Sequence, residues 1–70
     1  MIRENVVSSD LKSVGYDAER QIMEVEFHAG GVYHYFAVPE SVYEQLMAAS
    51  SKGRFMNLQI KKLYRCQRVG

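Results

Sequence analysis

Residues 23–38 place the strongest constraint on the fold, because they combine an alternating segment, two glycines and an aromatic segment. Met23, Val25 and Phe27 alternate with charged or polar residues, which is the pattern of a half-buried β-strand. Residues 29–31, Ala-Gly-Gly, predict a hairpin connection, since glycine adopts positive φ without steric cost. Residues 32–38 are β-branched and aromatic and predict the partner strand. The centre of the chain is therefore expected to be an antiparallel hairpin.

The segments on either side of this hairpin predict one more strand and two less regular ends. Residues 11–16 predict a short first strand, and residues 17–20 predict the turn that joins it to the hairpin. Residues 1–10 are expected to form a loose lead-in. The tail, residues 66–70, is expected to be either a short strand or frayed.

Helical patterning begins after Pro39, which ends the third strand and suits the first turn of a helix. Residues 41–44 also fit a capping box, so the predicted start of the helix can shift by two residues. Three apolar residues then fall at i, i+4 and i+7 on one face: Val42, Leu46 and Ala49. Residues 50–53 break this helix, and helical spacing resumes from residue 55 to about residue 64, with Met56, Ile60 and Leu63 on one side.

Together these elements predict an α+β fold, in which a three-stranded antiparallel β-meander precedes an αα-hairpin packed on one face of the sheet. Seventy residues allow a single domain, and we place its core at about residues 8–68. Cys66 is the single cysteine and has no partner for an internal disulfide. The sequence has no apolar run near 18 residues, and Glu4 lies where a signal peptide would be apolar. We therefore expect a cytoplasmic protein that makes no contact with membranes.

The formal net charge of +1 hides a division between the two parts of the chain. Residues 1–44 contain three bases and eight acids, whereas residues 45–70 contain six bases and no acid. Such asymmetry favours an anionic partner for the basic part. The alternative is that the acidic sheet and the basic helix pair with each other.

Tyr33 and Tyr35 flank His34 on the third strand, and the length of the hairpin loop decides which way they face. With a two-residue loop, both tyrosines lie on the face opposite Val25 and Phe27. With a three-residue loop, Phe27 lies opposite Tyr33, and both tyrosines join the Val25–Phe27 face. Tyrosines on an open face suit base stacking or a subunit interface, and the alternative is that both are core residues.

The residues Ser51, Lys52, Gly53 and Arg54 come just before the second predicted helix and suggest a site for an anion. Free backbone N–H groups and the positive end of the helix dipole favour negative charge there. If the helix reaches residue 65, four polar residues span about 80° of one face. These residues are Arg54, Asn57, Lys61 and Arg65. The alternative for both features is an ordinary capped helix with a solvated face.

The ordered set of motifs resembles the KTSC domain family, named after the C-terminus of some lysyl-tRNA synthetases. The resemblance covers about residues 8–68 and rests on the alternating strand ending at Phe27, the glycine turn, Tyr-His-Tyr at 33–35 and Val38-Pro39. It continues through Ser51-x-Gly53-x-Phe55-x-Asn57 and Ile60-Lys61-x-x-Tyr64, and Ser13-x-Gly15-Tyr16-Asp17 fits the usual opening. It implies a domain that occurs both appended and free-standing in bacteria and phages, and for which RNA binding has been suggested.

We expect a non-enzymatic module, with no catalytic residue, metal or cofactor, that binds a compact phosphate-bearing ligand such as a nucleotide. A cyclic oligonucleotide signal is one such ligand, and a phage protein that sequesters it would counter an immune response. We expect a homo-oligomer, because a chain of 70 residues rarely encloses a pocket alone. The alternatives are RNA binding, against which a pI of about 7.9 counts, and protein–protein interaction.

Overall fold

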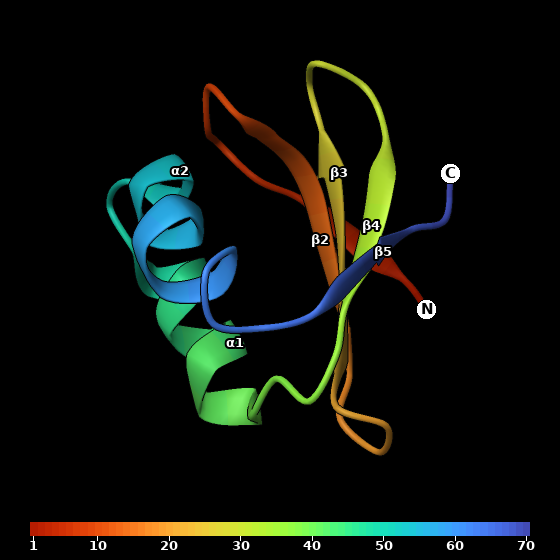
Figure 1. The fold of residues 1–70 in the computed structure, drawn as a ribbon. Helices are drawn as coiled ribbons and strands as arrows, with labels where there is room; N and C mark the ends of the chain where they lie inside the picture. Colours follow the sequence, from red (N-terminus) through yellow and green to blue (C-terminus); the bar gives the residue numbers. More distant parts are fainter.

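The computed structural model describes residues 1–70 as a five-stranded antiparallel sheet with two short helical segments on one face (Figure 1). The strands form a meander in the order β1-β2-β3-β4-β5: β1 (Arg3–Asn5), β2 (Leu11–Asp17), β3 (Ile22–Phe27), β4 (Val32–Tyr35) and β5 (Cys66–Arg68). The helical segments are α1 (Glu40–Ala48), α2 (Lys52–Phe55) and a π-helical turn, η1 (Met56–Ile60), that continues α2. The predicted α+β class is confirmed, and the tail forms a strand.

The N-terminal segment differs from the prediction, because residues 3–5 form an edge strand and not a loose lead-in. β1 pairs with β2, with Arg3 opposite Gly15. A Cβ atom at Gly15 would lie 2.8 Å from the carbonyl oxygen of Ile2, so glycine permits the close approach of the two backbones. Arg3 also bonds Glu24 of β3 at 2.8 Å. These tertiary contacts, and not any local alternation, produce the strand.

Four residues, 28–31, connect β3 to β4, and the Phe27 amide donates to the Gly31 carbonyl at 3.1 Å. This bond leaves three residues, His28 to Gly30, in the turn itself. Both glycines that follow Ala29 have positive φ, 112° and 93°, as the tight turn requires. In this register Tyr33 lies opposite Val25. The three-residue alternative is therefore confirmed for the face on which both tyrosines lie. Its pairing of Phe27 with Tyr33 is wrong, because Val25 lies opposite Tyr33.

The sheet has an inner face, which packs against the helices, and an outer face, which does not. Nine buried residues form the core between the sheet and the helices: Leu11, Val14, Met23, Val25, Tyr35, Val38, Leu46, Met56 and Ile60. Figure 1 shows both helices on one side of the sheet and both termini on the other. The longest helix, α1, has nine residues, and no helix is long and apolar enough to cross a membrane.

The second helical segment is shorter than predicted. Met56 and Ile60 are buried as expected, but η1 ends at Ile60, and Leu63 is 65% exposed. In η1 the bonds close wider turns, with the Lys61 amide donating to the Met56 carbonyl at 2.8 Å. The two apolar anchors thus hold η1 on the core while the chain turns away after them.

We predict that Ile60→Ala lowers the free energy of unfolding by about 2–5 kcal/mol, because it leaves a cavity in the core. Urea denaturation measures this loss. The matched control is Leu58→Ala in the same turn, where the side chain is 51% exposed and the expected change is within about 0.5 kcal/mol. If Ile60→Ala does not fold, Ile60→Val should still cost about 0.5–1.5 kcal/mol. Equal losses for Ile60 and Leu58 would contradict the packing described.

Candidate functional site

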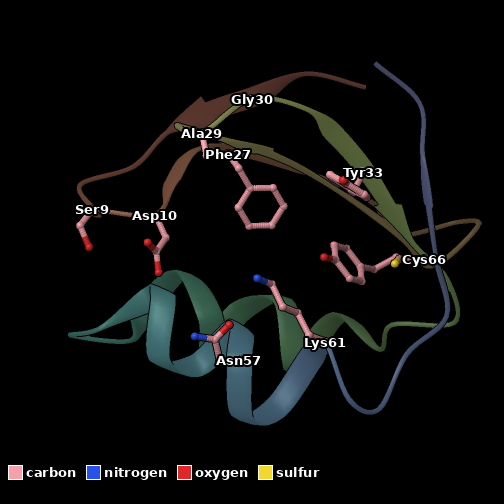
Figure 2. Close-up of a pocket in the computed structure, with 10 residues that line it drawn as sticks. Ser9, Asp10, Phe27, Ala29, Gly30, Tyr33, Asn57, Lys61 and Cys66 are labelled. Atoms are coloured by element: carbon pink, nitrogen blue, oxygen red, sulfur yellow. The ribbon is translucent and has the colours of Figure 1, made fainter.

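An open groove of about 550 Å³ lies between the inner face of the sheet and η1 (Figure 2). Its walls come from the segment before β2, from the β3–β4 hairpin, from η1 and the residue after it, and from β5. The lining residues are Ser9, Asp10, Phe27, Ala29, Gly30, Tyr33, Tyr35, Asn57, Lys61 and Cys66. Four of these were predicted as ligand-binding residues: Tyr33, Tyr35, Asn57 and Lys61.

The sheet side of the groove is aromatic. Phe27 and Tyr33 meet edge to face, with ring centroids 5.7 Å apart and an interplanar angle of 76°. The ammonium group of Lys61 lies 5.0 Å from the centroid of the Phe27 ring, within the range of a cation–π contact. Figure 2 shows the Phe27 ring and the Lys61 side chain pointing toward each other across the groove. The groove therefore joins an aromatic surface to a positive charge.

Tyr35 belongs to the core and the groove at once. It is only 3% exposed, so the core interpretation of this tyrosine is confirmed, yet it lines the groove. Burial, with smaller effects from Cys66 and Tyr33, raises the pKa of Tyr35 to about 12. The phenol therefore keeps its proton at neutral pH and is a hydrogen-bond donor.

The helical side of the groove contains only part of the predicted polar stripe. Asn57 and Lys61 line the groove, whereas Arg54 lines a separate hollow beside the end of α1. The stripe assumed an α-helix through residue 65, but η1 adds a residue to the turn and the helix ends at Ile60. Arg65 lies beyond the helix, where its carbonyl accepts a bond from the Phe36 amide. The prediction that all four residues share one helical face is wrong.

The predicted anion turn at residues 51–54 lies apart from the groove. Ser51 makes no side-chain cap to the helix, and it lines the same hollow as Arg54. The ammonium of Lys52 donates to the Ala49 carbonyl at 3.1 Å, at the end of α1. A Cβ at Gly53 would lie 2.5 Å from the Asp10 carboxylate, so this glycine makes room for another part of the chain. We therefore leave these four residues out of the site proposed below.

The acidic and basic parts of the chain do not pair with each other. Every ion pair within 4.0 Å joins residues of the first part, and most lie on the outer face. Glu24 bonds His34 at 2.7 Å and Arg3 at 2.8 Å, and Arg3 and Lys12 approach Glu26. The hydrogen bond with His34 is the main cause that lowers the pKa of Glu24. Burial opposes this shift, and Arg3 adds to it. The six bases of residues 45–70 have no Asp or Glu partner in the chain, and Lys61 is one of them.

Sequence reasoning did not select Asp10, Phe27 or Cys66 as site residues. Phe27 was assigned to the strand pattern alone, and Asp10 to the loose lead-in of residues 1–10. The register of the hairpin brings Phe27 beside Tyr33, and the pairing of β5 with β4 brings Cys66 opposite Tyr35. The glycine at position 53 was the one signal that another group approaches α2 closely.

Comparison with known proteins shows that this chain belongs to the KTSC domain family, whose profile matches residues 7–64. An uncharacterized protein of Stutzerimonas stutzeri is 47% identical over 70 residues, which is 99% of each chain. The crystal structure of a KTSC domain protein from Yersinia pestis superimposes with a TM-score of 0.96 at 39% identity, covering 99% of this chain and 97% of that one. A lysine–tRNA ligase of Nostoc punctiforme is 39% identical over 87% of this chain, but the match spans 11% of the ligase.

We predict that stability declines between about pH 10 and pH 12, partly through Tyr35. The folded pKa of about 12 lies above the unfolded value near 10, so the unfolded chain loses this proton first and unfolding becomes easier as pH rises. Tyr35→Phe should remove up to about 3 kcal/mol of this decline and change stability little at pH 7. Urea denaturation of both proteins at pH 8 and pH 11.5 measures the difference. Parallel declines would contradict the assigned burial.

Proposed function

We propose that this protein binds a compact phosphate-bearing ligand, most simply a nucleotide, in the groove between the sheet and η1. The observation that carries the proposal is the meeting of an aromatic surface, Phe27 and Tyr33, with the ammonium of Lys61, which has no carboxylate partner. A volume of about 550 Å³ is within the usual range for sites that hold small ligands. The groove is formed by one chain.

Each part of a nucleotide has a counterpart in this groove. A base that stacks on an aromatic ring gains roughly 1–3 kcal/mol, and Phe27 and Tyr33 offer the ring faces and edges. The Lys61 side chain is exposed and forms no salt bridge, so its ammonium is available to a phosphate, with which a charge-assisted hydrogen bond is stronger than the contact with the Phe27 ring. Asn57 and the protonated phenol of Tyr35 supply further hydrogen bonds from the two sides.

In this role the protein binds the ligand and does not convert it. Tyr35 keeps its proton at neutral pH and so acts as a hydrogen-bond donor in the groove, not as a general base. A larger ligand, such as a cyclic oligonucleotide signal, would place one base in each groove, and a homo-oligomer would present several grooves to it. Tight binding of such a signal would sequester it, which is the anti-defence role we expect for a phage-encoded form.

RNA is the second candidate ligand, because relatives of this domain are parts of lysine–tRNA ligases. Stacking aromatics and unpaired bases also suit single-stranded RNA. Residues 1–44 contain eight acids and three bases, and this excess of negative charge would repel a long phosphate chain. The pI of about 7.9 is also below that of typical RNA-binding domains. A single nucleotide in the groove avoids that repulsion.

We predict that Lys61→Gln weakens the binding of nucleoside monophosphates at least tenfold, since it removes one charge-assisted bond of roughly 1.5–3 kcal/mol. Isothermal titration calorimetry measures the affinity, and a melting curve should show an unchanged Tm. The control is Lys62→Gln, which removes the same charge from the next, exposed residue and should change affinity less than threefold.

Two results would count against the nucleotide. Equal losses for Lys61→Gln and Lys62→Gln would mean that the positive charge acts diffusely and that the groove is not the site. Binding of a short single-stranded RNA but of no mononucleotide, with affinity falling steeply as salt rises, would favour the RNA alternative.

A further inference from the structure

Asp10 is a carboxylate in the groove that the proposed nucleotide site has not yet used. Its side chain forms no ion pair and accepts no hydrogen bond within the chain, although it lies close to the start of α2. Figure 2 shows Asp10 and Ser9 at one end of the groove, with Lys61 farther along it and Cys66 at the other end. The groove thus has the Asp10 carboxylate at one end and the Lys61 ammonium farther along it.

The backbone around Asp10 is held firmly on both sides. The Ser8 hydroxyl accepts bonds from the amides of Asp10 and Leu11, both at 3.2 Å. The Asp10 carbonyl accepts a bond from the His28 amide at 3.0 Å, and Leu11 is fully buried. The absence of a side chain at Gly53 leaves the space that the carboxylate needs. A recognition group held in this way loses little entropy when it binds.

We propose, resting on the nucleotide site above, that Asp10 selects guanine among the bases. An ionised carboxylate only accepts hydrogen bonds, and its two oxygens can take two parallel donors. Guanine presents such a pair on its Watson–Crick edge, the N1–H and the N2 amino group. The carboxylate also repels phosphate, so the ligand is oriented with its base toward Asp10 and its phosphate toward Lys61.

The other bases fit a carboxylate less well. Adenine places its N1 lone pair beside its amino group, and cytosine does the same with N3, so one carboxylate oxygen would face an acceptor. Uracil offers one N–H between two carbonyl groups. Hypoxanthine keeps the N1–H of guanine but lacks the amino group, so it should bind with intermediate affinity. A hydrogen-bond acceptor of the base that faces a carboxylate oxygen gains no hydrogen bond and is repelled by its charge, so binding is weaker.

The test is calorimetric titration of the wild type with GMP, IMP and AMP, repeated with Asp10→Asn and Lys61→Gln. The wild type should bind GMP at least about tenfold more tightly than AMP, with IMP between them. Asn offers one acceptor and one donor, which matches the edge of adenine, so Asp10→Asn should abolish or invert this ratio. Lys61→Gln should weaken GMP and AMP by the same factor and leave the ratio unchanged.

The ratio of GMP to AMP affinity separates base selection from other effects of Asp10. Loss of one negative charge alone raises the affinity for both nucleotides equally, and the control Glu19→Gln, at an exposed turn residue, should leave the ratio unchanged. Gly53→Ala would push the carboxylate aside and should reduce the ratio with Asp10 intact. Equal, Lys61-dependent binding of GMP and AMP by the wild type would overturn guanine selection and keep the nucleotide site. Absence of any mononucleotide binding would overturn both.

Discussion

The turn between β3 and β4 has three residues, His28 to Gly30, closed by the bond from the Phe27 amide to the Gly31 carbonyl. This short turn places Tyr33 opposite Val25 and Tyr35 opposite Met23. A shift of one residue would move both tyrosines to the outer face and leave the core without Tyr35. The same register brings the Phe27 ring beside Tyr33, so one turn determines the core and the aromatic side of the groove together. This turn requires positive φ at Gly30 and Gly31, and glycine adopts such angles without steric strain.

Charge is separated between the two faces of the sheet. On the outer face, Glu24 and Glu26 are paired with Arg3, Lys12 and His34, all from the first part of the chain. The six bases of the second part have no Asp or Glu partner. The uneven charge that the sequence shows is therefore a property of the folded surface as well, and one of the six bases, Lys61, lines the groove.

The sequence predicts the elements with strong periodicity and misses those made by distant contacts. The alternation before Phe27 and the apolar stripe around Leu46 predict β3 and α1, because burial of one face leaves a periodic trace. The strand predicted over residues 32–38 also forms, but β4 ends at Tyr35. The strand β1 depends on the close approach at Gly15, and the π-helical turn η1 depends on packing of Met56 and Ile60, neither of which has a local signal. For the same reason half of the predicted polar stripe reaches the groove, and Asp10, which is distant in sequence from η1, was not foreseen as part of the site.

Amide NMR of isotope-labelled protein during titration with GMP tests most directly whether this groove is a binding site. The account predicts that saturable shifts cluster at the hairpin around Phe27 and Tyr33 and at η1 around Asn57 and Lys61, with the outer face around His34 unchanged. Shifts centred on the outer face, or on the hollow beside Arg54, would show that the ligand binds elsewhere. Amide spectra that do not change up to millimolar GMP would contradict the assignment of a nucleotide to this groove.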